Sequence, residues 1–143
     1  MKKRVLFLMC TALCMVLLCS CATLMQPINQ ANAQSKLEKI EQDCLKKGYD
    51  VGPVTESEMN SVIESIVAGQ GVVLEGPAVG MLMYSYEEQD AFMIATVIGM
   101  SSAKDAKALA NAMRSMTDDA ENDSLTVEIS QSGLIVTMLQ IYG

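Results

Sequence analysis

The chain has 143 residues, enough for one domain, and a net charge of −7 at pH 7, with no histidine and no tryptophan. The lack of histidine excludes Ser-His-Asp and Cys-His nucleophilic sites and most zinc centres. Three of the ten basic residues precede residue 5, whereas all seventeen acidic residues follow residue 35, so the later part carries a net charge of −10. Such an acidic body repels phosphate backbones, which argues against a nucleic-acid partner.

The first residues have the organisation of a bacterial secretion signal. Lys2, Lys3 and Arg4 form a positive segment, and residues 5–18 follow without a charge. This uncharged run suits the apolar part of a signal peptide and is shorter than the roughly 20 residues of a membrane-spanning helix. We therefore expect residues 1–21 to be a signal peptide.

The end of this segment, Leu18-Cys19-Ser20-Cys21, resembles the lipobox of bacterial lipoproteins. In that family a leucine stands three places before an obligatory cysteine, and a small residue stands just before it. The cysteine thiol receives a diacylglycerol, and cleavage makes it the new N-terminus. The resemblance implies that Cys21 is the lipid attachment site. It also implies that the protein is anchored to a membrane of the cell envelope and faces the periplasm or the cell surface, since two or three acyl chains anchor stably.

The next segment, residues 22–34, carries no charge and includes Pro27 and several asparagine and glutamine residues. Such a composition is typical of a flexible tether. Ala31-Asn32-Ala33 offers an alternative, because Ala-x-Ala is the motif of ordinary signal peptidase. Cleavage after Ala33 would release a freely secreted protein. A third interpretation leaves the apolar segment uncleaved as an anchor.

Residues 35–143 are expected to form a single α+β domain that begins with a leading helix. Ser35 and Glu38 have the spacing of a capping box, and Gly48 can end the helix in the left-handed conformation. Cys44 falls on the apolar face of this helix, which predicts a buried core residue.

A short strand and a second helix follow. Residues 49–54 are expected to be extended. Thr55 and Glu58 again have capping-box spacing, and Val54 and Met59 stand at the two positions of a hydrophobic staple.

Two hairpins are expected in the rest of the domain, with a third helix between them. Residues 78–86 and 91–99 should pair, and the second run is apolar on both faces, as in a strand covered on both sides. Ser102 should cap the helix. Residues 125–130 and 134–142 should form the last hairpin.

After the leading helix, the expected order is β-α-β-β-α-β-β. Its first six elements match the ferredoxin-like split βαβ plan, so the sequence predicts an antiparallel sheet with helices on one face. If residues 49–54 are only a loop, a looser α-β-β-α-β-β arrangement results. In pattern, without a diagnostic motif, the domain resembles small α+β modules that follow bacterial lipoprotein signals, which implies an accessory role.

The sequence contains no catalytic or metal-binding constellation, and no cofactor is expected. Asp119, Glu121 and Asp123 have the initial spacing of a calcium loop, but Ser124 and Ser130 replace the required glycine and glutamate. A solvated connector explains this loop better. An enzyme using carboxylates alone would need at least two acidic side chains in one pocket. The candidates are Glu75, Glu87, Glu88, Asp90 and Glu128.

Tyr84, Tyr86 and Tyr142 lie near predicted strand ends and are the candidate contact surface. The lipobox, the tether and the missing catalytic constellation favour a lipid-anchored envelope protein that is not an enzyme. We expect its partners to be the membrane, through the lipid, and another envelope protein. The alternative is a freely secreted sensor or carrier of a small ligand.

Overall fold

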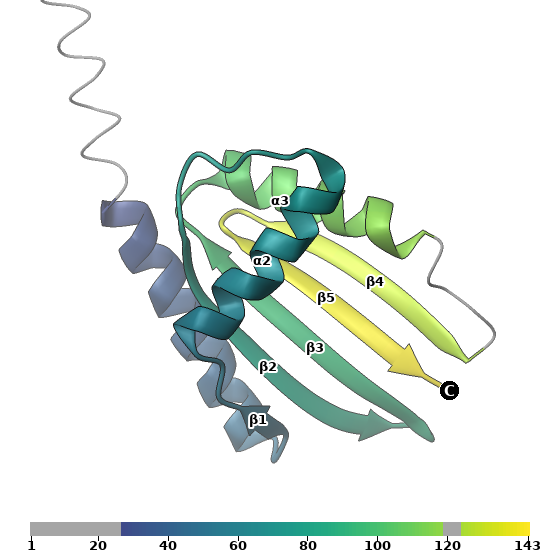
Figure 1. The fold of residues 1–143 in the computed structure, drawn as a ribbon. Coiled ribbons are helices and arrows are strands. Elements are labelled where there is room, and N and C mark those ends of the chain that lie inside the picture. The colour runs from purple at the N-terminus through teal and green to yellow at the C-terminus, as the bar shows by residue number, and fades with distance from the viewer. Residues whose placement is uncertain (1–26, 119–123) are drawn as a thin grey trace, which may run out of the picture.

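The computed structural model describes residues 27–118 and 124–143 and shows an α+β fold around one five-stranded antiparallel sheet (Figure 1). The strands are arranged in the order β1-β2-β3-β5-β4. Along the chain, the elements are a helix at residues 27–46, β1 (Asp50–Gly52), α2 (Glu56–Gln70), β2 (Ala78–Glu88), β3 (Ala91–Met100), α3 (Ala103–Thr117), β4 (Leu125–Ser132) and β5 (Ile135–Tyr142).

The antiparallel sheet and the α+β class are confirmed, whereas the ferredoxin-like order is not. In a split βαβ plan, β1 would lie inside the sheet between later strands. Here β1 lies at an edge and pairs antiparallel with β2 alone. With three residues, β1 is too short to serve as a central strand. It is nevertheless a strand, so the looser arrangement with a loop in its place is wrong.

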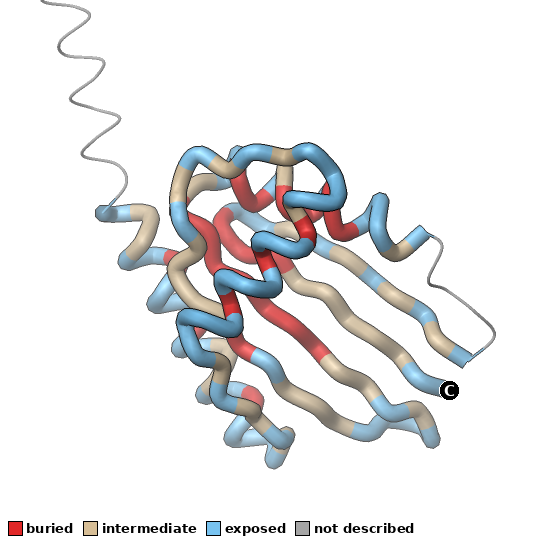
Figure 2. The backbone as a smooth tube through the Cα atoms, viewed as in Figure 1, coloured by how far each residue is buried: buried red, intermediate tan, exposed pale blue. Residues whose placement is uncertain are grey.

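Helices cover both faces of the sheet. Ile98 and Met100 of β3 pack with α2 and α3 on one face, which we call the helix-pair face. Val97 packs with Leu37 of the 27–46 helix on the opposite face, which we call the single-helix face. Figures 1 and 2 show this layering and the buried upper half of β3. The prediction that this strand is covered on both sides is confirmed, and the prediction that helices lie on one face is wrong.

The 27–46 helix includes residues that the sequence assigned to the tether. Residues 27–34 are helical, and Ser35 lies within the helix instead of capping it. The cause is tertiary packing, because Ala33 and Leu37 are buried against glycines of the sheet. A Cβ atom on Gly99 would lie 2.9 Å from Leu37 Cδ1 and 3.5 Å from Ala33 Cβ. Residues 22–26 lie outside the described residues.

The local signals for the other helix ends are confirmed. Gly48 has a φ of 75° just beyond the 27–46 helix. Thr55 and Glu58 form the predicted capping box, in which the Thr55 amide donates to Glu58 Oε2 at 2.8 Å. Ser102 Oγ accepts a hydrogen bond from the Asp105 amide at 3.1 Å and caps α3.

Cys44 is buried, with 5% of its surface exposed, as predicted. Within the described part of the chain, no helix has the length and apolar character needed to cross a membrane.

Candidate functional site

The structure divides the three predicted contact tyrosines between the two faces of the sheet. Tyr84 packs against the cluster around Leu37 on the single-helix face, and Tyr86, two residues further along β2, points to the same side. Tyr142 is four residues beyond Met138, which packs with α2 and α3, so Tyr142 points to the helix-pair face. Tyr84 and Tyr86 therefore share a site that Tyr142 does not join.

Tyr49 completes a stack of three rings on the single-helix face. Its ring centroid lies 4.5 Å from that of Tyr86 and 5.9 Å from that of Tyr84. The ammonium group of Lys47 lies 5.6 Å from the centre of the Tyr49 ring. Sequence reasoning missed Tyr49, although its place directly after Gly48 put it at the start of the strand that pairs with β2.

The ring stack is partly withdrawn from water. Burial raises the pKa of Tyr84 above its ordinary value, with smaller contributions from Cys44, Tyr86 and Tyr49. Burial also raises the pKa of Tyr86, and Tyr49 and Glu88 add to this effect. The hydroxyls of Tyr84 and Tyr86 therefore stay protonated at neutral pH. The three rings form an aromatic cluster between the C-terminal end of the 27–46 helix and β2.

The helix-pair face is covered over only part of its length. α2 and α3 pack over one end of the sheet, while the other end projects beyond them (Figures 1 and 2). We call this second region the open sheet end and define it by Met83, Phe92, Ile94, Leu125 and Tyr142. Their common direction follows from the register, since Phe92 is paired with Tyr142, and Tyr142 with Leu125.

Three large side chains of the open sheet end are exposed to solvent. Met83 is 39% exposed, Phe92 42% and Tyr142 39%. The rings of Phe92 and Tyr142 contact each other, with centroids 6.4 Å apart and planes tilted by 42°. Scattered apolar side chains are normal on protein surfaces, but a contiguous group on one face is typical of an interaction site.

A hollow of about 200 Å³ lies within the open sheet end. Gly52 of β1 is paired with Met83 of β2, and the missing side chain leaves a depression beside Met83, Phe92 and Ile94. Asp50 is the one charged residue in its lining. The hollow is smaller than the roughly 300–1,000 Å³ typical of small-molecule sites. It suits an apolar side chain inserted by another protein.

A group of polar residues at the start of α3 stabilises the fold. Asp105 is 2% exposed, and its two carboxylate oxygens accept hydrogen bonds from the amides of Glu75 and Gly76, each at 3.0 Å. Lys104 pairs with the Glu75 side chain at the surface. Asp105 therefore ties the loop before β2 to α3, with both oxygens engaged.

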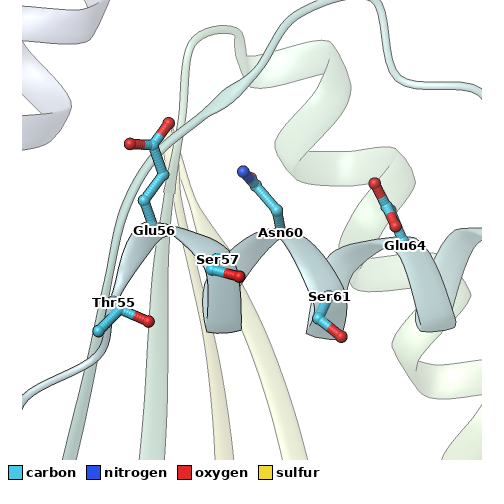
Figure 3. A pocket seen from close by; sticks show the side chains of 6 residues that line it. All are labelled: Thr55, Glu56, Ser57, Asn60, Ser61 and Glu64. Atoms are coloured by element: carbon cyan, nitrogen blue, oxygen red, sulfur yellow. The ribbon is translucent and has the colours of Figure 1, made fainter.

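A hollow of about 720 Å³ follows the outer surface of α2. Six polar side chains from this one helix line it: Thr55, Glu56, Ser57, Asn60, Ser61 and Glu64. Figure 3 shows Glu56, Asn60 and Glu64 projecting to one side of the helix, while Ser61 projects to the opposite side. Because these groups diverge, they do not form a constellation for acid–base chemistry.

The five acidic candidates do not gather in a pocket. Glu75, in the loop before β2, lies beside Lys104 at the start of α3. Glu87, Glu88 and Asp90 lie at the β2–β3 turn. None of these four, nor Glu128, lines the hollows on α2 or at the open sheet end.

Several predicted positions fall outside the structural description. Cys21 and the calcium-like residues Asp119, Glu121 and Asp123 lie outside the described residues. Within residues 27–118 and 124–143, no group of three histidine, cysteine, aspartate or glutamate side chains is placed to hold a metal ion.

In comparisons of this chain with protein families, curated proteins and solved structures, nothing matches. No relative therefore assigns a role to any of its residues.

Proposed function

We propose that this protein is a lipid-anchored module of the bacterial cell envelope, without enzymatic activity, that binds another envelope protein through the open sheet end. The observation that carries the proposal is the exposed apolar group of Met83, Phe92 and Tyr142 beside the hollow at Gly52. Aromatic and methionine side chains around a small pocket are the residue types enriched in protein–protein interfaces.

The chemistry of the surface favours a protein over other partner classes. The net charge of −10 beyond residue 35 opposes nucleic acid. The hollow of about 200 Å³ is small for a metabolite or a cofactor. An apolar side chain of a partner would displace water from Met83, Phe92 and Ile94, which contributes about 25 cal/mol per Å² of apolar surface buried.

The proposed address rests on the lipobox resemblance at Cys21. The position of Ala33 supports cleavage at Cys21 over cleavage after Ala33. Ala33 has no exposed surface and lies inside the 27–46 helix, next to Gly99. Cleavage after it would remove the first turns of this helix together with a packed residue. A chain beginning at Cys21 keeps the whole described helix.

The alternative function is a freely secreted carrier of a small ligand. A specific observation gives it a site, since a hollow of about 360 Å³ lies between α2 and the start of β2. That volume falls within the range of small-molecule pockets. A chain that is released with Gln34 as its first residue would favour this alternative.

Site-specific crosslinking in cells tests the binding surface. A photoreactive residue at position 92, in a chain with an intact lipobox, should give one discrete crosslinked protein. Tyr142→Ser should reduce the yield about tenfold or more, because truncating an aromatic hot spot at the centre of an interface costs about 2 kcal/mol or more. Val73→Ser is the matched control, since Val73 is 86% exposed and lies in the α2–β2 loop. Equal loss with both substitutions, or no crosslinked protein, would contradict the proposal.

Membrane fractionation and intact mass test the address. The wild-type chain should be found in the membrane fraction, with a lipid-sized mass increment on Cys21. Cys21→Ala should abolish both. A soluble wild-type chain without the increment would contradict the anchor while leaving the crosslinking result to decide the binding surface.

A further inference from the structure

Part of β2 has no strand from the described residues beside it at the edge of the sheet. β2 has eleven residues and β1 has three. The three residues of β1 pair with Met83, Tyr84 and Ser85. Among the described residues, no strand therefore pairs with residues 78–82 on the side away from β3. An unpaired strand edge presents backbone N–H and C=O groups that a further strand can bind.

This stretch lies at the bottom of a groove. On one side of it, a hollow of about 360 Å³ is lined by the start of α2 and by residues 78–81. On the other side, a hollow of about 260 Å³ is lined by the 27–46 helix and by residues 80–82. Both hollows reach Val54, Gly80 and Met81, so they flank the same strand edge.

The local backbone keeps this edge irregular and short. The register with β3 shifts between Ala78 and Gly80, so Val79 occupies a bulge. A Cβ atom on Gly80 would lie 2.9 Å from Leu37 Cδ1, so glycine at this position lets the 27–46 helix approach β2 closely. Five residues flanked by two helices admit one short strand and do not offer the long flat edge that leads to aggregation.

The groove has acidic walls beside a few apolar side chains. Met59, Met81 and Leu37 supply apolar lining. Glu38 and Glu41 of the 27–46 helix line one hollow, and Glu56 of α2 lines the other. No lysine or arginine is among the residues that line these two hollows in the described structure. The charge of the walls therefore selects a partner with basic side chains.

We propose that residues 78–82 are a strand-addition site for an extended peptide segment of another protein that carries lysine or arginine residues. Backbone hydrogen bonds along the β2 edge supply affinity, and alternate side chains of the peptide face the two hollows. The basic side chains meet Glu38, Glu41 and Glu56. This site lies at the edge of the sheet and is separate from the open sheet end, so it does not depend on the function proposed above.

A synthetic peptide in which pairs of lysine residues alternate with pairs of valine residues is the probe, added to the full chain. In an extended peptide this pattern directs lysine side chains to both hollows. We expect it to slow hydrogen exchange of amides within residues 78–82 and to leave exchange at Phe92 and Tyr142 unchanged. The same peptide with alternate valines replaced by proline should not bind, because proline removes backbone donors. A peptide with glutamate in place of lysine should bind at least about tenfold more weakly.

Substitutions in the walls provide the matched comparison. Glu41→Gln and Glu56→Gln should each weaken binding of the lysine–valine peptide about two- to fivefold, the range of an exposed charge pair. Glu64→Gln, on α2 but outside both hollows, should leave binding unchanged. Glu56 and Glu64 are exposed and Glu41 is half-buried, so none of the three substitutions changes a buried core residue.

Three results would overturn the inference. They are no binding of the lysine–valine peptide at millimolar concentration, equal binding of the proline-containing peptide, or protection that appears at Phe92 and Tyr142 instead of residues 78–82. The last result would assign peptide binding to the open sheet end. The crosslinking from position 92 is unaffected by any of these results, so the two proposals fail independently.

Discussion

At the scale of single residues, Asp105 is the clearest structural determinant. Its buried carboxylate accepts two backbone hydrogen bonds from the loop that precedes β2. We predict that Asp105→Ala lowers the free energy of unfolding by about 2–4 kcal/mol, because both amides lose a charged acceptor. Urea denaturation measures this change. Lys104→Ala removes only an exposed ion pair and should cost less than about 1 kcal/mol. Equal effects of the two substitutions would contradict the role of Asp105.

Cys44 is a second residue whose behaviour follows from its surroundings. Burial raises the pKa of its thiol, an effect that Lys47 partly offsets and Asp43 reinforces. A raised pKa means less thiolate at a given pH, and the thiolate is the reactive form. In a chain that starts at residue 22, Cys44 is the sole cysteine. We predict that a thiol reagent at pH 8 modifies the folded protein at least about tenfold more slowly than the protein in denaturant. Equal rates would show that the thiol is accessible in the folded state.

At the scale of elements, the 27–46 helix is held to the sheet by a few side chains and by the glycines opposite them. Leu37 is 7% exposed and fits against Gly80 and Gly99. We predict that Leu37→Ala destabilises the protein by about 2–4 kcal/mol, since it leaves a cavity that backbone glycines cannot fill.

The matched control is Leu45→Ala in the last turns of the same helix. Leu45 is 52% exposed, so the same truncation there should cost less than about 1 kcal/mol. Thermal unfolding of the two variants separates the effects. A similar loss at both positions would mean that helix propensity, and not packing on the sheet, is responsible.

At the scale of the whole molecule, the excess of acidic residues opposes compaction. The ion pairs Asp43–Lys46 and Glu75–Lys104 are exposed, so screening them removes little stability. Screening the net charge of −10 relieves repulsion. We predict that raising NaCl from about 0.02 to about 0.5 M stabilises the domain by about 0.5 kcal/mol, roughly 2–4 °C in Tm. A fall in Tm with salt would show that attractive pairs dominate.

The part of the candidate site that lies on one strand could be predicted from the sequence, whereas the parts that join different strands could not. Tyr84 and Tyr86 could be placed on one face from the two-residue period of a strand. Tyr142 lies on a different strand, and its face depends on the pairing of Phe92 with Tyr142. The open sheet end and the unpaired edge of β2 could not be predicted either. Each is defined by where a neighbouring element ends, and periodicity within one strand carries no information about that.

The sequence by itself determined the features that depend on neighbours along the chain. The Thr55–Glu58 capping box, the Ser102 cap and the left-handed Gly48 each need a few adjacent residues, and all three are present. The burial of both faces of β3 was predictable for the same reason, because apolar residues occupy both faces of this strand.

Only the tertiary structure decided which strands are neighbours and how far the first helix extends. The order β1-β2-β3-β5-β4 depends on pairing between segments that are distant along the chain. The helix includes residues 27–34 because Ala33 packs against Gly99 of the sheet. This contact joins residues that are far apart along the chain, so no local sequence pattern predicts it. The same packing leaves residues 78–82 without a further strand from the described part of the chain on the side away from β3, because β1 ends at Gly52 and the chain turns into α2.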